Sequence, residues 1–227
     1  MTSVITGAYG FIGKHLSAYL KDRGETVIPI VSASTLPDWE FGLGNADVVY
    51  HLAGVNRPKQ VQEFFDTNAG LTWKLCGMLK ELHRQPKIVL ASSIQAVLGN
   101  PYGISKKLAE DIVRNFARQS GSVIRIHRLR NVFGEGCRPN YNSVVATFCH
   151  NIANDLPVHV ADEKREIELV YVKDVVTAMA NDYLDMPSTK IPLGDLRKLI
   201  EGFCAGIAPF DCFQKQLFDT YKSYERT

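Results

Sequence analysis

The stretch TGAYGFIG, residues 6–13, decides the fold class, because it links a β-rich apolar run to a helical pattern. The run before it is SVIT (3–6), and the segment after it, FIGKHLSAYLKDRG (11–24), has its apolar residues at helical spacing. A glycine-rich turn between a strand and a helix lets backbone N–H groups at the start of the helix face a ligand. The stretch therefore predicts a strand, a turn and a helix that bind the pyrophosphate of a dinucleotide.

Each glycine of this turn has a predicted task. Gly7 permits the tight turn, Gly10 lets the pyrophosphate approach the backbone, and Gly13 lets the helix pack closely on the strand. The spacing is G-x-x-G-x-x-G instead of G-x-G-x-x-G. The alternative of a tight turn that binds nothing therefore stays open.

The first two-thirds of the chain alternate β-rich runs with helical patterns, which is typical of a parallel sheet covered on both faces. The predicted strands are SVIT (3–6), TVIPIV (26–31), DVVYHLA (47–53), KIVLAS (87–92) and VIRIHRL (123–129). The predicted helices between them cover 11–24, about 59–84, and 102–121. Gly24 and Gly121 stand where helices commonly end on a glycine.

The pattern changes after Asn131. A loop-like stretch is followed by a predicted helix at 143–156, short strands in VHVA (158–161) and EIELVYV (166–172), a helix at 173–186, and two helices in the tail from 193 to 227. With no linker or repeat, we expect a single domain over 1–227. Residues of about 1–130 would bind the dinucleotide, and residues of about 131–227 would form mostly a substrate-binding region and C-terminal helices.

Composition narrows the class of protein. The 227 residues carry a net charge of +2, which gives no electrostatic footprint for nucleic acid or a membrane surface. The number of cysteines is five, an odd number with no metal-binding spacing, which indicates a reducing compartment and no metal site. No signal peptide and no apolar segment of membrane-spanning length is visible, so the expected location is the cytoplasm.

The end of the second predicted strand bears on the choice of nicotinamide cofactor. An acidic side chain there binds the ribose 2′-hydroxyl of NAD, whereas its absence leaves room for a 2′-phosphate. The segment PIVSAST (29–35) has no acidic residue before Asp38, which favours NADP(H) over NAD(H). No arginine or lysine stands there to grip a phosphate, so NAD(H) stays open.

The stretch YGISK (102–106) carries the candidate catalytic pair. Tyr102 and Lys106 are four residues apart and share one face of a helix, where the ammonium is expected to lower the pKa of the phenol. Ser93 ends the preceding strand in ASSIQA (91–96), where its hydroxyl could polarise a carbonyl; Ser92 is the alternative, and either serine could instead cap a turn.

Two further polar residues lie near these motifs. We interpret His51 as a packed residue at a strand end rather than as a catalytic base. Asn68 stands at the expected start of a helix, where an N-cap is the ordinary role of an asparagine.

Taken in order, these motifs resemble the extended short-chain dehydrogenase/reductase family, within the NAD-dependent epimerase/dehydratase superfamily. The matching stretches are TGAYGFIG, HLAG, TNAGLTWKL, ASS followed by YGISK, RNVFGEG (130–136) and YVKDV (171–175). The resemblance implies an α/β fold, namely a Rossmann-type doubly wound parallel sheet with a small interleaved C-terminal substrate-binding region. It also implies a homodimer.

The resemblance further assigns roles to residues. Tyr102 would be the acid/base, Lys106 would hold the nicotinamide ribose and tune the tyrosine, and Ser93 would bind the reacting oxygen. The implied cofactor-binding residues, besides Tyr102 and Lys106, are Gly7, Tyr9, Gly10, Phe11, Ile12, Gly13, Leu52, Ala53 and Gly54.

The stretches HLAGVNRP (51–58), SSIQA (92–96) and PNYNSVVATFCHNIA (139–153) resemble more closely the reductase half of the CapF family of capsular-polysaccharide synthesis enzymes. This implies NADPH-dependent reduction of the 4-keto group of a UDP-6-deoxy-hexose of the 4-keto-6-deoxy-HexNAc type. That family adds a C-terminal cupin with epimerase activity, and the present sequence ends about where the cupin would begin. The implied substrate contacts, besides Ser93, are Asn131, Arg138, Asn142, Ser143 and Arg165.

Two other functions stay open. A nucleotide-sugar epimerase or dehydratase with retained NAD would use the same scaffold, but a dehydratase usually needs an acid–base pair where Ile94, Gln95 and Ala96 stand. A non-catalytic NADP(H)-binding protein would typically lack the tyrosine or the lysine, and both are present.

Overall fold

The computed structural model describes residues 1–225, and the chain divides into two compact units. The first unit is Met1–Leu129 with Val176–Leu184, and the second is Arg130–Val175 with the residues from Asp185 onward. The change of pattern expected after Asn131 falls at the border between the units, while 176–184 returns to the first unit. The expectation for the end of the tail, 226–227, lies outside the described residues.

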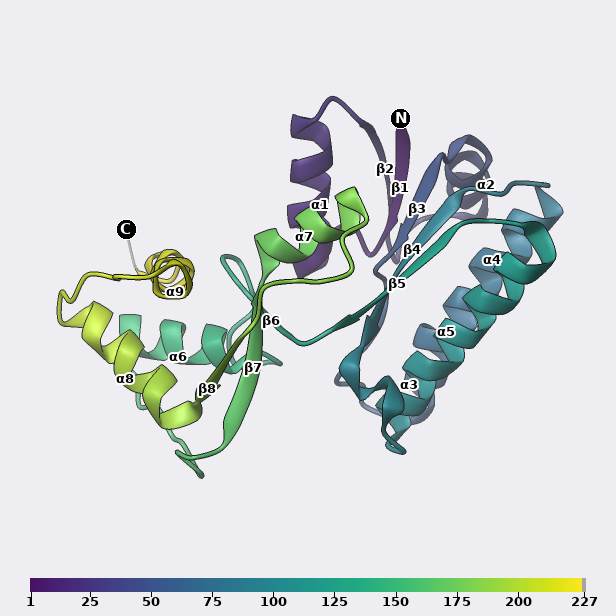
Figure 1. Cartoon of the computed structure of the whole chain (residues 1–227). Coiled ribbons are helices and arrows are strands. Elements are labelled where there is room, and N and C mark those ends of the chain that lie inside the picture. Colours follow the sequence, from purple (N-terminus) through teal and green to yellow (C-terminus); the bar gives the residue numbers. More distant parts are fainter. Residues whose placement is uncertain (226–227) are drawn as a thin grey trace. The chain divides into compact units, whose positions relative to one another are not determined.

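The first unit is built on a parallel sheet with strands in the order β2-β1-β3-β4-β5 (Figure 1). The strands are β1 (Thr2–Thr6), β2 (Thr26–Ile30), β3 (Val48–His51), β4 (Lys87–Ser93) and β5 (Ile124–Leu129). The ends of each strand lie within two residues of those of a predicted strand. The doubly wound Rossmann-type prediction is therefore confirmed.

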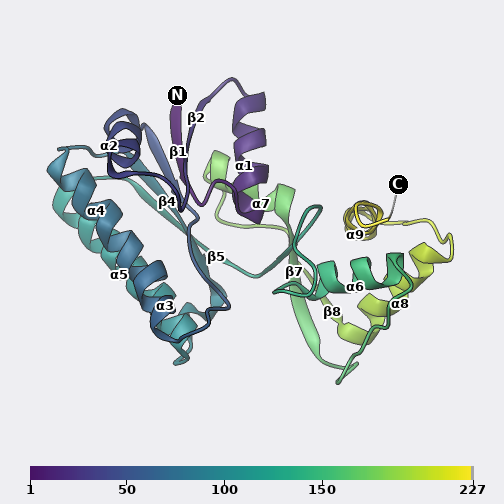
Figure 2. The ribbon, with the colours of Figure 1, turned by 180° about the vertical axis from the view of Figure 1, so that it is seen from behind.

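Helices cover both faces of this sheet, as Figure 2 shows from behind. α1 (Phe11–Asp22) and the end of α7 (Val172–Asn181) lie on one side, and the side chain of Asn181 donates to the Tyr19 hydroxyl at 3.0 Å. α2 (Leu36–Asn45), α4 (Leu71–Glu81) and α5 (Pro101–Ser120) lie on the other. Gly24 and Gly121, beyond α1 and α5, have φ of 76° and 82°, so the predicted glycine ends are confirmed.

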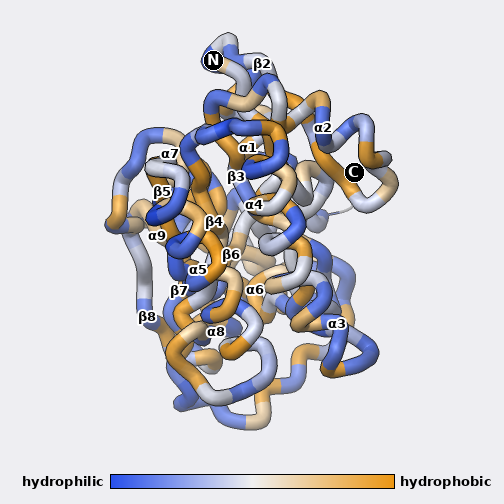
Figure 3. The backbone as a smooth tube through the Cα atoms, turned by 90° about the vertical axis from the view of Figure 1, so that its right-hand side faces the viewer, coloured by the Kyte–Doolittle hydropathy of each residue, from blue (hydrophilic) through white to orange (hydrophobic). Residues whose placement is uncertain are grey.

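The core of the first unit explains why its strands could be recognised. Val4, Val49 and Ile88 are completely buried, since both faces of their strands are covered. In Figure 3 the tube is orange along most of β4, whereas the alternating residues of β5 change colour along the strand. β5 lies at the sheet edge, where the Arg125 and Arg128 side chains are only partly covered.

Helix α2 was not predicted, because its segment LPDWEFGLGN contains a proline and two glycines. Its start is fixed by a capping box. The Thr35 hydroxyl accepts from the backbone of Asp38, and the Asp38 carboxylate accepts from the backbone of Thr35 at 2.7 Å. The spacing of these two residues was the missed signal.

The predicted helix at about 59–84 is interrupted. It consists of α3 (Gln62–Phe64), a π-helical turn η1 (Phe65–Gly70) and α4. Asn68 lies inside the π turn, so its interpretation as an N-cap was wrong. A π turn inserts one residue into the helical register, a change that hydrophobic spacing does not reveal.

The second unit contains a small sheet in the order β6-β7-β8. β6 (Asn131–Phe133) runs parallel to β7 (Glu166–Tyr171), and β8 (Thr189–Pro192) runs antiparallel to it. The helices are α6 (Val144–Ala153), α8 (Leu193–Cys204) and α9 (Cys212–Lys222).

The predictions for this unit were less accurate. The strand predicted at 158–161 was wrong, since these residues lie in a loop, and β6 and β8 were missed. Strands of three or four residues are too short to show an apolar pattern. Helices α6, α8 and α9 agree with the expected helical segments.

Within residues 1–225, none of the helices combines the length and the apolar composition needed to cross a membrane.

Candidate active site

The glycine turn after β1 has the close packing that its sequence predicts. Gly7 has φ of 72°, and a Cβ there would lie 2.9 Å from the Ala53 nitrogen. A Cβ on Gly13 would lie 2.2 Å from the Gly7 carbonyl oxygen, so only glycine lets α1 come this close to the turn. Gly10 is the N-cap of α1 and has no side chain to occupy the first N–H groups of the helix. Backbone donors are thus left for an anion, which fits a pyrophosphate.

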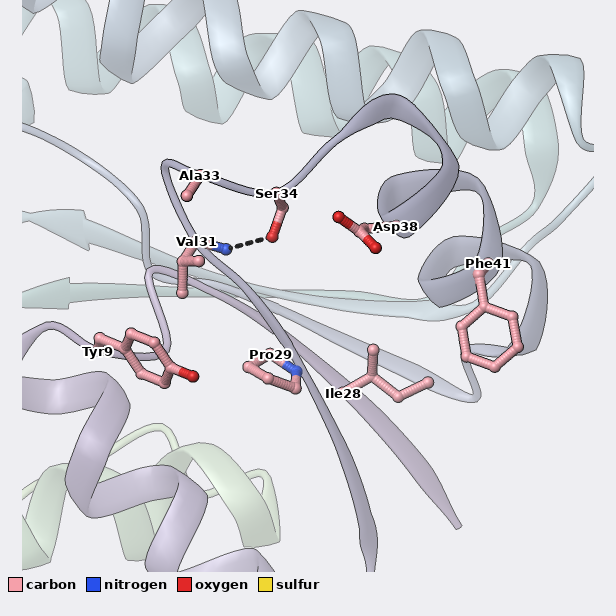
Figure 4. Close-up of a pocket in the computed structure, with 8 residues that line it drawn as sticks. All are labelled: Tyr9, Ile28, Pro29, Val31, Ala33, Ser34, Asp38 and Phe41. Atoms are coloured by element: carbon pink, nitrogen blue, oxygen red, sulfur yellow. Dashed lines mark hydrogen bonds between the residues drawn. The ribbon is translucent and has the colours of Figure 1, made fainter.

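A pocket of about 340 Å³ opens beside this turn (Figure 4). Tyr9 of the turn forms one wall, and the end of β2 with α2 forms the rest, through Ile28, Pro29, Val31, Ala33, Ser34, Asp38 and Phe41. The Tyr9 ring is 68% exposed, and the next residues, Phe11 and Ile12, begin α1. Mixed apolar and polar walls next to an anion-binding turn fit the adenosine end of a dinucleotide.

The loop after β3 carries Leu52, Ala53 and Gly54 past the glycine turn. The Ala53 N–H donates to the Thr6 hydroxyl at 3.2 Å, and the Leu52 N–H donates to the Thr6 carbonyl. A Cβ on Gly54 would lie 2.8 Å from Oδ1 of Asn68 and 3.8 Å from Nζ of Lys106. The predicted cofactor-binding loop therefore approaches the predicted catalytic lysine.

Asn68 holds this loop in place. Its Oδ1 accepts from the Val55 N–H at 2.9 Å, and its Nδ2 donates to the Val55 carbonyl at 3.1 Å and to the Ser105 hydroxyl at 2.9 Å. Its own backbone carbonyl accepts from the Thr72 hydroxyl. The π turn thus places the Asn68 amide where its hydrogen bonds join the loop after β3 to α5.

His51 is buried at the end of β3 between two threonines. Its Nδ1 lies 2.7 Å from the Thr6 hydroxyl, and its Nε2 lies 2.9 Å from the Thr72 hydroxyl. Burial, with a smaller contribution from the charge of Lys106, lowers the pKa of His51 to about 3. A neutral ring with both nitrogens engaged fits the interpretation of a packed strand-end residue.

The predicted catalytic residues come together at the end of β4 and the start of α5. Ser93 is buried, and its side chain lies near enough to Tyr102 to lower the pKa of the phenol. The Ser93 hydroxyl also accepts from the Gln95 N–H at 3.1 Å, because Ser93 caps the 3₁₀ turn η2 (Ile94–Val97). Ser92, the alternative, points elsewhere and donates to the Glu110 carboxylate at 2.6 Å. The geometry therefore favours Ser93.

Lys106 faces the same site from one turn further along α5. It is 7% exposed, and its Nζ donates to the Ala91 carbonyl oxygen at 2.5 Å. Burial lowers the pKa of Lys106 to about 8, and the charge of Glu110 opposes this change.

The phenol of Tyr102 differs from the expectation. Burial raises the pKa of Tyr102, and the nearby Ser93 side chain lowers it by less. The expected decrease caused by Lys106 is therefore not found, because desolvation of the phenolate is the larger effect and the ammonium is bound to a backbone carbonyl.

Gly103, between Tyr102 and Ile104, was not recognised as a site residue. A Cβ there would lie 2.2 Å from the Gln95 carbonyl oxygen and 2.6 Å from that of Leu98. The first turn of α5 packs directly on η2, which links the position of Tyr102 to that of Ser93.

Gly103→Ala is therefore expected to force η2 and α5 apart and to lower kcat by about a hundredfold, since misplacement of catalytic groups by about 1 Å has this effect. Turnover and thermal unfolding of the variant would be compared with Gly99→Ala, where a Cβ meets nothing within 4 Å. Equal kcat in the two variants would contradict the proposed link.

The predicted substrate-binding residues outside β4 lie in the second unit. Asn131 begins β6 and donates to the Glu168 carbonyl at 3.1 Å, and Ser143 caps α6 by accepting from the Ala146 N–H at 3.2 Å. The Arg138 guanidinium lies 5.2 Å from the centre of the Tyr141 ring. Asn142 and Arg165 are exposed on loops. Ser143 thus caps α6, and substrate binding by these five residues stays a prediction.

The model of the NAD dependent epimerase/dehydratase family matches residues 3–181. The chain belongs to this family. The match includes the glycine turn and the Ser93, Tyr102 and Lys106 cluster, and it extends into α7.

A family member from Pseudomonas aeruginosa, named UDP-2-acetamido-2,6-beta-L-arabino-hexul-4-ose reductase, is 43% identical over 177 residues, which are 78% of this chain and 48% of that protein. The crystal structure of the capsular polysaccharide assembling protein CapF from Staphylococcus aureus superposes with a TM-score of 0.90 at 36% identity and covers all of this chain and 66% of that one. The present chain thus spans about half to two-thirds of these family members.

The UDP-glucose 4-epimerase of Thermus thermophilus in complex with NAD has a TM-score of 0.82 at 19% identity, covering 99% of both chains. At this identity the similarity shows the fold alone.

Proposed function

We propose that the chain reduces the 4-keto group of a UDP-6-deoxy-hexose of the 4-keto-6-deoxy-HexNAc type, with NADP(H) as cofactor. The observation that carries the proposal is the cluster of Ser93, Tyr102 and Lys106 beside a glycine turn suited to a dinucleotide. The similarity to a reductase of a UDP-hexul-4-ose, at 43% identity, supports the choice of substrate. Synthesis of a surface polysaccharide precursor in the cytoplasm is the setting we propose, in view of the likeness to CapF.

The chain's own residues would do the following chemistry. The Tyr102 hydroxyl donates a proton to the oxygen that gains charge when the keto carbon is reduced. The Ser93 hydroxyl, next to the phenol, donates a hydrogen bond to the same oxygen, which stabilises the transition state. Lys106, one helical turn after Tyr102, would supply a positive charge to the site, where burial strengthens electrostatic interactions.

The residues that would hold the cofactor lie along the glycine turn and the loop after β3. The backbone N–H groups of Phe11, Ile12 and Gly13, in the first turn of α1, suit the pyrophosphate, and Tyr9 lines the pocket beside them. When bound, the nicotinamide supplies the hydride. Leu52, Ala53 and Gly54 would lie along the cofactor, near Lys106.

A preference for NADP(H) is supported by the end of β2. The strand ends at Ile30, and Val31 to Ser34 carry no carboxylate. Asp38 does line the pocket, but its Oδ2 already accepts from the N–H and the hydroxyl of Thr35, at 2.7 and 2.8 Å. A ribose 2′-hydroxyl would have to share this carboxylate with the capping box.

The test is to follow the absorbance of NADPH and NADH with a panel of UDP- and dTDP-4-keto-6-deoxy sugars. We expect oxidation of NADPH with the UDP sugars, at a kcat/KM about tenfold higher than with NADH, a difference of about 1.4 kcal/mol. Ala33→Asp places a carboxylate in the pocket and should reverse this preference, whereas the uncharged Ala33→Asn should not. Activity with NADH alone, or with non-sugar ketones alone, would overturn the proposal.

A further inference from the structure

Glu110 is a carboxylate that the proposed chemistry does not use, although it lies at the site. It is on α5, one turn after Lys106 and two turns after Tyr102, and its exposed fraction is 0%. Burial of an ionised carboxylate is unfavourable unless it is paired and hydrogen-bonded. The groups around Glu110 must therefore offset the cost of burying its charge.

Donors from three elements surround this carboxylate. Its Oε1 accepts from the Ser92 hydroxyl at 2.6 Å and from Nε of Arg128 at 2.8 Å. Its Oε2 accepts from Nη2 of Arg128 at 2.8 Å and from Nη2 of Arg114 at 3.0 Å. Burial alone would raise the pKa of Glu110, but the hydrogen bonds from Arg128, Ser92 and Arg114 outweigh it and lower the pKa to about 2. Glu110 is therefore ionised at neutral pH.

These bonds join the ends of two strands to the catalytic helix. Ser92 of β4 and Arg128 of β5 are direct partners in the sheet register, and Glu110 binds both from α5. The preceding residue of β4, Ala91, accepts from Lys106. Two successive residues of β4 are thus held to α5 by two side chains one helical turn apart, and the next residue of β4 is Ser93.

We propose that Glu110 is a positioning residue, which ties the ends of β4 and β5 to α5 and so sets where Ser93, Tyr102 and Lys106 lie relative to one another. It does not touch the reacting atoms. Its kinetic consequence rests on the proposed reductase function, but its effect on Lys106 does not.

The charge of Glu110 also reaches Lys106. Two titratable groups interact with the ammonium from the elements packed around it: Glu110 on α5, and His51 on β3, which is neutral. Glu110 is the anionic one, and it opposes the effect of burial on the lysine. Removal of this charge should therefore move the titration of Lys106 to lower pH.

Two variants and a control separate the hydrogen bonds that Glu110 makes to β4 and β5 from the effect of its charge on Lys106. Glu110→Gln keeps the shape and removes the charge, whereas Glu110→Asp keeps the charge and is too short to reach β4. Asp111→Asn is the matched control, since Asp111 is the next residue of α5 and its side chain is 51% exposed. The measurements are kcat and KM for the keto sugar, the Kd of NADPH, and the titration of Lys106 by NMR of ¹³C-labelled lysine, assigned by its loss in Lys106→Met.

We expect kcat to fall about a hundredfold in Glu110→Gln and about tenfold or more in Glu110→Asp, with KM for the sugar changed less than threefold. The Lys106 titration should move to lower pH in Glu110→Gln and stay in Glu110→Asp. Asp111→Asn should match the parent in every measurement.

A kcat within twofold of the parent in both Glu110 variants, with an unmoved Lys106 titration, would overturn the proposal. If Glu110→Gln does not fold, Ser92→Ala removes only the tie to β4, and an unchanged kcat there would also overturn it. Absence of turnover by the parent would count against the proposed reductase, whereas the Lys106 titration and the Kd of NADPH would still test the role of Glu110.

Discussion

Replacement of Tyr102 by phenylalanine is expected to lower kcat by about a thousandfold, because a positioned general acid contributes about 10²–10⁴. Phenylalanine keeps the packing of the ring, whose centre lies 5.6 Å from that of Phe64, and it removes the hydroxyl whose pKa Ser93 affects. The Kd of NADPH should therefore change by no more than about twofold. Stopped-flow measurement of NADPH oxidation gives kcat, and fluorescence titration gives the Kd of NADPH.

The pair of measurements also decides between an enzyme and a protein that only binds NADP(H). If NADPH binding survives while turnover is lost, Tyr102 acts in the chemistry. If the unaltered chain binds NADPH and turns over no keto sugar of the panel, the non-catalytic function is correct. Tyr183→Phe is the control, since Tyr183 is 58% exposed and lies beyond α7. A Tyr102→Phe variant as active as this control would exclude Tyr102 as the proton donor.

The parallel sheet could be predicted because its central strands are buried on both faces. Such strands are short apolar runs, and the run Val48–His51 is buried at every residue. Helix α2 could not be predicted from apolar spacing, because a capping box starts it and glycines interrupt its pattern. β6 and β8 pair with β7 over three or four residues, and only tertiary pairing makes such segments strands.

Some features of the candidate site could likewise be predicted from local sequence, and others depend on the tertiary fold. The i, i+4 spacing of Tyr102 and Lys106 is local, so the helix alone places them on one face. The choice between Ser92 and Ser93 is not local, since it depends on which hydroxyl faces Tyr102 and which faces Glu110. Likewise, the carboxylate of Glu110 meets Ser92 and Arg128, both 18 residues away in sequence, only after the sheet forms. The pKa of the phenol also required the fold, because burial determines its direction.

Replacement of Lys106 by methionine is expected to lower kcat by about 10²–10³ and, at pH 7, to increase the stability of the protein. The folded-state pKa of Lys106 is about 8, below its ordinary value of 10.5, because the ammonium is buried. Below pH 8 both the folded and the unfolded chain carry the proton, so the folded state bears the full cost of the buried charge. This shift corresponds to about 3 kcal/mol, and loss of the hydrogen bond to the Ala91 carbonyl offsets about 1 kcal/mol.

The sign of the pH dependence follows from proton binding. Between about pH 8 and 10.5 the unfolded parent binds more protons than the folded parent, so the stability of the parent rises with pH across this window. The advantage of Lys106→Met, about 2 kcal/mol at pH 7, should therefore shrink as the pH rises from 8 to 10. Urea unfolding of both proteins at pH 7 and pH 9.5 measures this difference in the free energy of unfolding. Lys107→Met is the control, because the Lys107 side chain is 45% exposed and pairs with Asp111. A Lys106→Met variant less stable than this control at pH 7 would show that the buried ammonium stabilises the fold and would contradict the expected gain.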